Sequence, residues 1–200
     1  MNMFDLIYPS EPAPLYPRPT SDRPGKQPIP RGEMLPLIES SGLVYGQAPR
    51  VWCHSEAGAK AMHPVVHLHL IDRFGKLYLQ KRSLSKHLLP GYWDTAVGGH
   101  ISYGEQVMEA LYREAGEELG LVTFNPVFLD AYPFFTGRDS EMVVTFAAVG
   151  HPDLHPDNAE VSEGKWWSFE ELDAAIGKKI ITPNFEWEFS RIRERLLALL

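Results

Sequence analysis

The sequence predicts an α/β (α+β) sandwich with a mixed sheet, preceded by an extended, proline-rich N-terminal arm. Strand-type and helix-type segments alternate along the chain without an internal repeat, which argues against an all-β barrel. The 200 residues are 44% hydrophobic and 22% charged, as expected for a globular domain that buries its own core. Prolines gather near the start of the chain, where they exclude a helix or a central strand.

The arm is expected to cover residues 1–32, and one globular domain is expected to cover residues 33–200. Eight of the 17 prolines lie between residues 9 and 30. Each proline removes a backbone donor and fixes φ, so this segment should be extended, either packed across the surface or partly mobile. The sequence leaves open whether the arm crosses onto a partner subunit in a homodimer.

Strands are expected where β-branched and aromatic residues recur between turn residues. These segments are residues 35–39, 43–45, 51–54, 65–72, 77–82, 93–97, 127–135, 142–149 and 165–168. Helices are expected where apolar residues recur every three or four positions, often behind a capping residue. These segments are residues 102–120, 168–176 and 183–199.

Charge and cysteine content exclude several classes of protein. The net charge is −7 and there is no run of Lys or Arg, so nucleic acid and anionic membranes are not expected as partners. Cys53 is the single cysteine, which excludes an intrachain disulfide and disfavours a cysteine-based zinc site. The first twelve residues lack the pattern of a signal peptide, and no run of about 18 apolar residues occurs. We therefore expect a cytoplasmic protein.

The helix expected at residues 102–120 carries three neighbouring carboxylates near its end, Glu114, Glu117 and Glu118. Ser102 with Glu105 has the spacing of a capping box at its start. Like charges three or four residues apart destabilise a helix by about 0.2–0.5 kcal/mol per pair. They also oppose the helix dipole. A divalent cation reverses the sign of both effects, and Mg²⁺ takes oxygen ligands.

The pattern G-x5-E-x7-R-E-x2-E-E-x-G is complete between Gly99 and Gly120. With Leu121 it resembles the Nudix box, the signature of the Nudix hydrolase family, over residues 99–121. The resemblance implies a Nudix-type α/β/α sandwich. It also implies a pyrophosphatase that directs water at a small-molecule diphosphate, such as a nucleoside diphosphate linked to a second group. Its cofactor would be Mg²⁺ or Mn²⁺.

The resemblance also implies a role for each residue of the box. Glu114 and Glu118 match the principal metal ligands, and Glu117 matches a ligand or the base that accepts a proton from water. Arg113 matches the residue that orients the glutamates, and Glu105 its ion-pair partner. The chemistry is consistent, because a cation lowers the pKa of its bound water and a nearby carboxylate takes the proton.

Residues 77–100 resemble the isopentenyl diphosphate isomerase branch of the superfamily through their R-x3-K and P-G-x-W elements. Arg82 and Lys86 match the positions that grip the substrate diphosphate in that branch. A guanidinium and an ammonium together suit a dianionic group. The alternative is that both are ordinary solvated side chains.

The same resemblance implies a second metal site, for Zn²⁺ or Mn²⁺, with four ligands: His54, His63, His100 and Glu141. Imidazole nitrogens suit these two ions better than Mg²⁺. Asp139 lies where a further carboxylate ligand would be. His67 and His69 share one face of the expected strand with His63, so they either replace a ligand or line a polar surface.

One departure separates the chain from the isomerase branch. The branch has a catalytic cysteine before its Gly-His pair, whereas this chain has Gly98 in the Gly98-Gly99 loop. Moving protons at an allylic carbon needs an ionisable group there, and Cys53 is far away in sequence. The glutamates of the box are all present. We therefore expect a hydrolase, with an isomerase or a non-catalytic metabolite-binding module as the alternatives.

Overall fold

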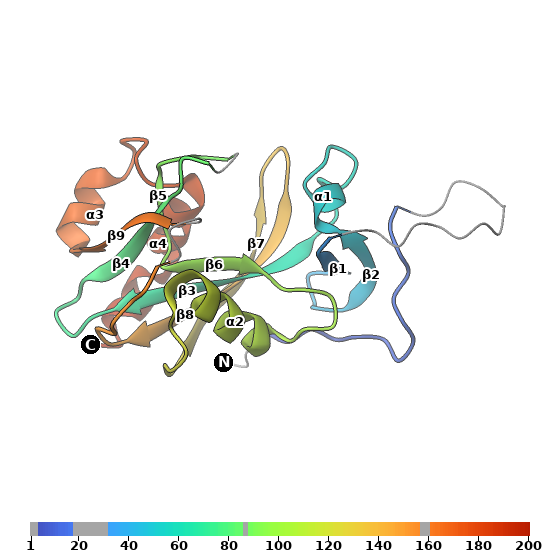
Figure 1. Ribbon diagram of the computed structural model, residues 1–200, viewed down its shortest axis with the longest axis horizontal. Helices are drawn as coiled ribbons and strands as arrows, with labels where there is room; N and C mark the ends of the chain where they lie inside the picture. The colour runs from blue at the N-terminus through green and yellow to red at the C-terminus, as the bar shows by residue number, and fades with distance from the viewer. Residues whose placement is uncertain (1–3, 18–31, 86–87, 157–160) are drawn as a thin grey trace. The chain divides into compact units, whose positions relative to one another are not determined.

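The computed structural model describes residues 4–17, 32–85, 88–156 and 161–200 (Figure 1). Its elements in chain order are β1 (Met34–Ile38), β2 (Val44–Pro49), α1 (Arg50–Cys53), β3 (His63–Ile71), β4 (Leu77–Arg82), β5 (Trp93–Asp94), β6 (Val97–His100), α2 (Val107–Leu119), β7 (Val127–Phe135), β8 (Ser140–Val149), β9 (Val161–Trp167), α3 (Phe169–Ala175) and α4 (Pro183–Leu197). Within these residues, no helix combines the length and apolar character needed to cross a membrane.

The strands of the described residues form a two-stranded sheet of β1 and β2 and a seven-stranded sheet. The larger sheet has the order β5-β4-β3-β8-β7, and in addition β6 pairs with β3 and β9 with β4. Strand β4 is antiparallel to β9, with Leu77 opposite Trp167 and Lys81 opposite Glu163. The predicted fold class, an α/β sandwich with a mixed sheet, is confirmed.

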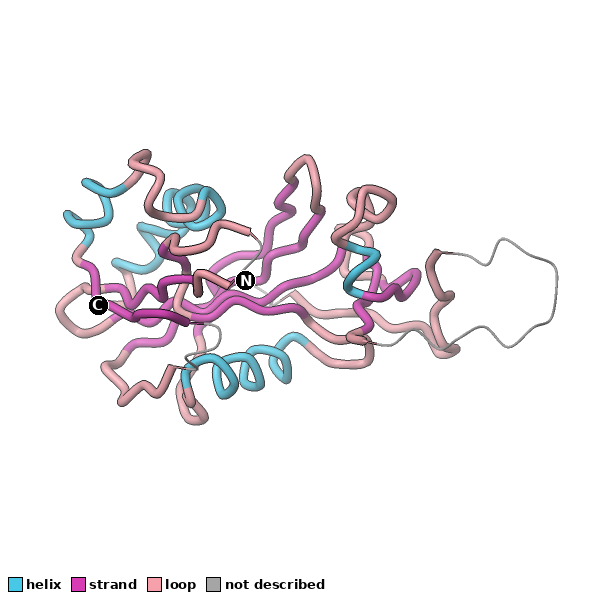
Figure 2. Tube along the Cα trace, turned by 45° about the horizontal axis from the view of Figure 1, so that its top comes forward, coloured by secondary structure: helices cyan, strands magenta, loops and turns pink. Residues whose placement is uncertain are grey.

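The chain divides into two compact units, each described here by itself. The first unit comprises Met1–Val65, His100–Ala110 and Ala131–Val144, and the second comprises Val66–Gly99, Leu111–Asp130 and Thr145–Leu200. In the second unit, α3 and α4 lie on one side of the strands and the part of α2 from Leu111 onward lies on the other (Figure 2). This unit therefore has the α/β/α layers of a sandwich.

Helices α3 and α4 begin as their sequences predict. Ser168 accepts a hydrogen bond from the backbone of Glu171, whose side chain accepts one from the backbone of Ser168, so the capping box is complete. Thr182 caps α4, and Pro183 occupies its first turn, where a missing N–H costs nothing. Their apolar faces pack with β4, β5 and β9 in one core, which includes Leu77, Trp93, Trp167, Leu172, Phe185, Phe189 and Ile192.

The described part of the arm, residues 4–17, runs alongside β2 and the turn before it in the first unit. The backbone N–H of Ile7 donates to Gly42 O at 2.9 Å, and that of Tyr16 donates to Gln47 O at 2.8 Å. Proline removes donors but leaves carbonyls, and Pro14 O accepts from Gln47 N–H at 2.8 Å. Most of the remaining proline-rich stretch lies outside the described residues, so the division at residue 32 stays a prediction.

Two strand predictions are wrong in detail. Residues 51–54 were expected to form a strand, but Arg50–Cys53 is a short helix that begins where Pro49 ends β2. The strand expected at 93–97 is divided into β5 and β6. The N–H of Thr95 donates to the side chain of Asp94 at 2.9 Å, so this donor does not continue the strand pairing.

Helix α2 begins at Val107, five residues later than expected. Glu105 accepts from the N–H of Ser102 at 3.0 Å, but the hydroxyl of Ser102 donates to Glu33 at 3.1 Å, so only half of the expected capping box forms. Instead, Glu109 accepts from the N–H of Gln106 at 2.8 Å, directly before the helix. The helix ends as predicted at Gly120, whose φ is +65°.

Candidate functional site

The orientation of α2 in the second unit is set by its apolar side. Leu111, Ala115 and Leu119 are completely buried, so the glutamates of the intervening positions lie beside the buried face. Their side chains differ in exposure. Glu118 is buried, the side chain of Glu114 is 13% exposed, and that of Glu117 is 62% exposed. The helix therefore presents one exposed carboxylate, that of Glu117, and two that are largely covered, those of Glu114 and Glu118.

Arg113 contacts two of these carboxylates, as the resemblance implied. Its Nη1 lies 2.8 Å from Glu114 Oε1 and 3.2 Å from Glu117 Oε2. One guanidinium nitrogen is thus shared by carboxylates on successive turns, which offsets part of their repulsion. A cation that binds these carboxylates must compete with this arginine.

Two glycines before the helix allow the glutamates to approach the backbone. A Cβ at Gly99 would overlap the carboxylate of Glu114, so only glycine fits with Glu114 in this place. Glu118 Oε2 accepts from Gln80 Nε2 at 2.9 Å and from the N–H of Gly98 at 3.4 Å. Gln80 was not predicted from the sequence, although a glutamine inside the apolar run of β4 is a signal that could have identified it.

Glu105 lies in the first unit, before α2. Besides the N–H of Ser102 that its carboxylate accepts, its carbonyl accepts the hydroxyl of Tyr8 at 3.1 Å. Tyr8 also accepts the N–H of Gly104 at 3.0 Å, and burial raises the pKa of Tyr8 to about 12. The arm therefore holds the turn that precedes the helix. The pairing of Glu105 with Arg113 stays a prediction.

The residues predicted to form a second metal site lie close together in the first unit. Among the described residues, two groups have ligand atoms within 4.8 Å of one another: His54, His63 and His100, and His63, Asp139 and Glu141. The Nε2 atoms of His54 and His100 are 3.0 Å apart, and His54 Nδ1 lies 2.7 Å from Asp139 Oδ2. All four predicted ligands and Asp139 therefore belong to one cluster, which we call the histidine cluster. The carboxylates of α2 form no group this close within the described residues.

Hydrogen bonds orient the rings of the histidine cluster. A carboxylate accepts only, so Nδ1 of His54 donates to Asp139, and Nε2 of His54 shares a hydrogen bond of 3.0 Å with Nε2 of His100. His63 Nε2 is buried and lies 3.5 Å from Asp139 Oδ1, beyond good hydrogen-bond geometry. Burial lowers the pKa of His63, although Asp139 opposes this effect. A neutral, buried imidazole is the form that binds a metal ion.

Arg82 is already engaged in the second unit. Its Nη1 lies 3.2 Å from Asp94 Oδ2, and its Nε donates to Leu88 O at 3.2 Å. Asp94 in turn accepts the hydroxyl of Thr182 at 2.9 Å. Lys86, the second predicted contact to a diphosphate, lies outside the described residues. Of the two residues predicted to contact a diphosphate, Arg82 alone lies within the described residues, and there it is bound to an acidic side chain.

His67 and His69 both face Glu188, a residue that was not predicted from the sequence. His67 Nδ1 lies 2.8 Å from Glu188 Oε2, and His69 Nε2 lies 3.4 Å from Glu188 Oε1. Glu188 is fully buried. Glu188 could have been identified from the sequence, because a carboxylate inside the apolar face of α4 needs a charged partner.

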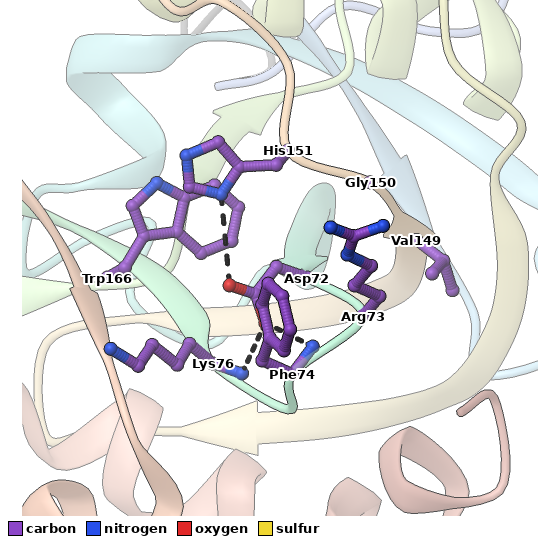
Figure 3. Close-up of a pocket in the computed structure, with 8 residues that line it drawn as sticks. All are labelled: Asp72, Arg73, Phe74, Lys76, Val149, Gly150, His151 and Trp166. Carbon is purple, nitrogen blue, oxygen red and sulfur yellow. Dashed lines mark hydrogen bonds and ion pairs between the residues drawn. The ribbon is translucent and has the colours of Figure 1, made fainter.

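One cavity of about 700 Å³ lies beside the β3–β4 turn in the second unit (Figure 3). His151 stacks on Trp166 with ring centroids 4.4 Å apart, and its Nδ1 lies 3.8 Å from Asp72. Asp72 also accepts the N–H groups of Phe74 and Lys76, which closes the turn. None of the predicted catalytic residues lines this cavity.

The structure combines an α/β/α sandwich, a helix that carries several glutamates, and a glycine loop whose backbone lies against them. These features together define the class of protein. The NUDIX domain family matches residues 61–185, and the chain therefore belongs to the NUDIX family. The resemblance seen in the sequence is confirmed. The predicted enzyme class, a hydrolase of diphosphate bonds, agrees with this family.

Similar proteins and structures support membership of the NUDIX family. An isopentenyl-diphosphate Delta-isomerase of Clavibacter sepedonicus is 31% identical over 79% of this chain and 82% of its own length. An uncharacterized Nudix hydrolase, YfcD of Escherichia coli K12, is also 31% identical, over 76% of this chain and 82% of its own. The crystal structure of DR0079 from Deinococcus radiodurans is 26% identical, with a TM-score of 0.68, over 80% of this chain and 99% of that one.

Proposed function

We propose that this protein is a divalent-metal-dependent hydrolase that cleaves a diphosphate linkage in a small molecule, such as a nucleoside diphosphate linked to a second group. The observation that carries this proposal is that α2 has all the glutamates of the Nudix box. In addition, Gly99 has no side chain, so the Glu114 carboxylate can lie against its backbone. A protein that only binds a metabolite has no need of carboxylates that activate water. Membership of the NUDIX family supports the same conclusion.

The residues present fit Mg²⁺ or Mn²⁺, because their donors are carboxylate oxygens. Glu114 and Glu118 would hold the cation, and Glu117 is a further ligand or the base. When bound, the cation offsets phosphate charge and makes its water more acidic. Gln80 and Gly98 orient Glu118, and Arg113 orients Glu114 and Glu117.

Glu117 is suited to accept the proton of the attacking water, because its side chain is 62% exposed and can turn between Arg113 and solvent. Glu105 is the ion-pair partner of Arg113 that the resemblance implies. Arg82, with Lys86, is the proposed contact to the substrate diphosphate. A phosphate that binds Arg82 must replace Asp94, now 3.2 Å from its Nη1.

The histidine cluster fits a second ion, Zn²⁺ or Mn²⁺, held by His54, His63, His100 and Glu141. The position of His63 supports this proposal, because its buried Nε2 belongs to both groups of close ligand atoms and has only a long 3.5 Å contact to Asp139 Oδ1 among the described residues. Asp139 holds His54 by its Nδ1, as outer carboxylates commonly hold histidine ligands. Imidazole nitrogens select these ions over Mg²⁺.

An isomerase is the second candidate, because relatives 31% identical to the chain are named isopentenyl-diphosphate Delta-isomerases and because the histidine cluster is complete. Gly98 weakens it, since glycine cannot carry a proton. Cys53 does not replace the missing cysteine. It is completely buried, and burial raises its pKa to about 12, so almost no thiolate forms at neutral pH.

The test is incubation of the protein with Mg²⁺ or Mn²⁺ and a panel of diphosphates: ADP-ribose, a dinucleoside polyphosphate, CDP, a nucleotide sugar and isopentenyl diphosphate. Products are followed by mass spectrometry. We expect cleavage of at least one compound, abolished by Glu117→Gln or Glu118→Gln. The matched control is Glu109→Gln on the same helix, because Glu109 is not one of the predicted ligands and its side chain accepts the N–H of Gln106 directly before the helix.

The other outcomes have separate meanings. Conversion of isopentenyl diphosphate to its isomer without release of phosphate supports the isomerase. Tight binding without turnover across the panel supports a metabolite-binding module and contradicts the hydrolase. Cleavage that persists in both glutamate variants contradicts the proposed roles of these residues.

A further inference from the structure

The cavity beside the β3–β4 turn lies wholly in the second unit and is lined by none of the predicted catalytic residues (Figure 3). Its volume of about 700 Å³ lies within the range of about 300–1,000 Å³ that is typical of sites for small molecules. Trp166 is half-buried at its wall, and Phe74, which also lines it, is 74% exposed. Flat aromatic surfaces beside a cavity of this size suit a planar ring.

Strand β4 holds the indole of Trp166 in place. Tyr78 lies directly opposite Trp166 in the pairing of β4 with β9. The two rings meet edge to face, with centroids 5.4 Å apart and planes at 65°. A Cβ at Gly164 would overlap the hydroxyl of Tyr78, so the glycine leaves room for this tyrosine. The wall of the cavity is therefore preorganised.

His151 already shows what the indole accepts. Its imidazole stacks on Trp166 with centroids 4.4 Å apart and planes at 19°, and its Nδ1 faces Asp72 Oδ2 (Figure 3). The distance to Asp72 is 3.8 Å, which is too long for a hydrogen bond, and the side chain of His151 is 64% exposed. A planar ring with a nitrogen toward the carboxylate therefore fits here, and a larger ring can take the place of this loosely held imidazole.

Asp72 supplies a buried acceptor. Its side chain is 5% exposed, and its Oδ1 accepts the N–H groups of Phe74 at 2.8 Å and Lys76 at 2.9 Å. Among the described residues, the side-chain contact of its other oxygen, Oδ2, is the long one to His151. Because an ionised carboxylate only accepts hydrogen bonds, the group that completes Oδ2 must carry an N–H or O–H.

Two exposed cations of the same turn, Arg73 and Lys76, also line the cavity. The guanidinium carbon of Arg73 lies 4.8 Å from the centre of the Phe74 ring. Lys76 lowers the pKa of Glu171 only as a minor cause, because the carboxylate of Glu171 is bound to Lys165 at 2.8 Å. Both cations can therefore attract an anionic group at the mouth of the cavity.

We propose that this cavity binds a purine nucleoside monophosphate whose base carries an amino group. The base replaces His151 on Trp166, its amino group donates to Asp72 Oδ2, and its phosphate faces the cations of the turn. A purine has a larger stacking surface than the imidazole that it replaces. The inference does not depend on the proposed hydrolase function, because a monophosphate contains no diphosphate bond.

The first experiment is calorimetric titration of the full chain with AMP in the presence of EDTA. Without a divalent cation the carboxylates of α2 repel a phosphate, so binding reports on this cavity. We expect one site with a Kd below about 1 mM. Purine riboside 5′-monophosphate, which lacks only the amino group, should bind about tenfold more weakly, because Asp72 then has no donor. Adenosine should bind about threefold more weakly at low ionic strength, and salt should reduce this difference.

The second experiment compares variants with the wild type. Trp166→Ala should weaken AMP binding about 5–150-fold through loss of stacking. The matched control is Trp187→Ala, an exposed tryptophan of α4, which should leave Kd within about twofold. Asp72→Asn keeps an oxygen for the turn and should remove the preference for AMP over purine riboside 5′-monophosphate. His151→Ala should tighten binding about two- to tenfold, because the base no longer displaces a stacked ring.

Several results would overturn the inference. They are the absence of AMP binding, equal wild-type affinity for AMP and purine riboside 5′-monophosphate, unchanged affinity in Trp166→Ala, and affinity that does not rise in His151→Ala. The comparison of the two nucleotides uses the wild type, so it decides the question even if a variant does not fold. An adenine oligonucleotide should bind no more tightly than AMP, because the chain has a net charge of −7. Much tighter binding of the oligonucleotide would show a nucleic-acid site instead.

Discussion

Replacing Gly99 with alanine tests whether Glu114 must lie against the backbone of β6. The added methyl group would overlap the Glu114 carboxylate. Non-bonded carbon atoms need about 3.5–4.0 Å, so the carboxylate must retreat by more than about 1 Å. The end of a glutamate side chain can move, so the stability cost should stay near the low end of about 1–3 kcal/mol. A displacement of about 1 Å at a catalytic group can lower the rate about 10²-fold.

The assay is kcat with Mg²⁺ on the panel compound that is cleaved fastest, together with urea unfolding. The matched control is Gly116→Ala in α2, where a Cβ meets only Val122 Cγ1 at 3.9 Å. That control should keep its activity and gain up to about 1 kcal/mol of stability, since alanine favours a helix over glycine. A Gly99→Ala variant that keeps more than half of kcat would refute the reasoning. It would show that catalysis does not require the Glu114 carboxylate to lie against the backbone of residue 99.

Three further predictions follow from other parts of the molecule. Asp139→Asn should weaken Zn²⁺ binding to the histidine cluster about 10–100-fold, measured with a chromophoric chelator, because it removes the carboxylate that orients His54; unchanged affinity would contradict this. The Cys53 thiol should react with a disulfide reagent only on unfolding, and its contribution to stability, present below about pH 9, should be lost as the pH rises toward 12, because its pKa is higher in the folded state. Glu188→Gln should lower the free energy of unfolding by about 3–5 kcal/mol, because the buried His67 loses its partner. The wild-type contribution of Glu188, present above about pH 4.5, should fade as the pH falls, because its folded pKa is lowered, and the variant should lack that dependence in urea titrations.

Short-range sequence patterns were enough to predict several helix and strand boundaries. Strand β7 at Val127–Phe135 and strand β4 at Leu77–Arg82 have the predicted bounds, because alternation and turn residues act over a few positions. The end of α2 at Gly120 was predictable for the same reason, since the left-handed cap needs only its own residue type. The spacing of the glutamates along one helix likewise placed them on one face.

Groups distant in sequence compete for the same hydrogen bonds, and only the tertiary structure decided between them. The hydroxyl of Ser102 binds Glu33, 69 residues earlier, so α2 begins later than its capping signal predicts. Gln80 reaches Glu118 across 38 residues.

The sequence alone identified the residues of the box by their spacing, and the resemblance identified the residues of the histidine cluster. Neither identified the partner of His67. Glu188 is 121 residues away, and the pair exists only because β3 and α4 are buried against each other. A buried charge needs an opposite charge nearby, because burying it alone is costly. Which residue supplies that charge depends on the tertiary packing and cannot be predicted from the sequence.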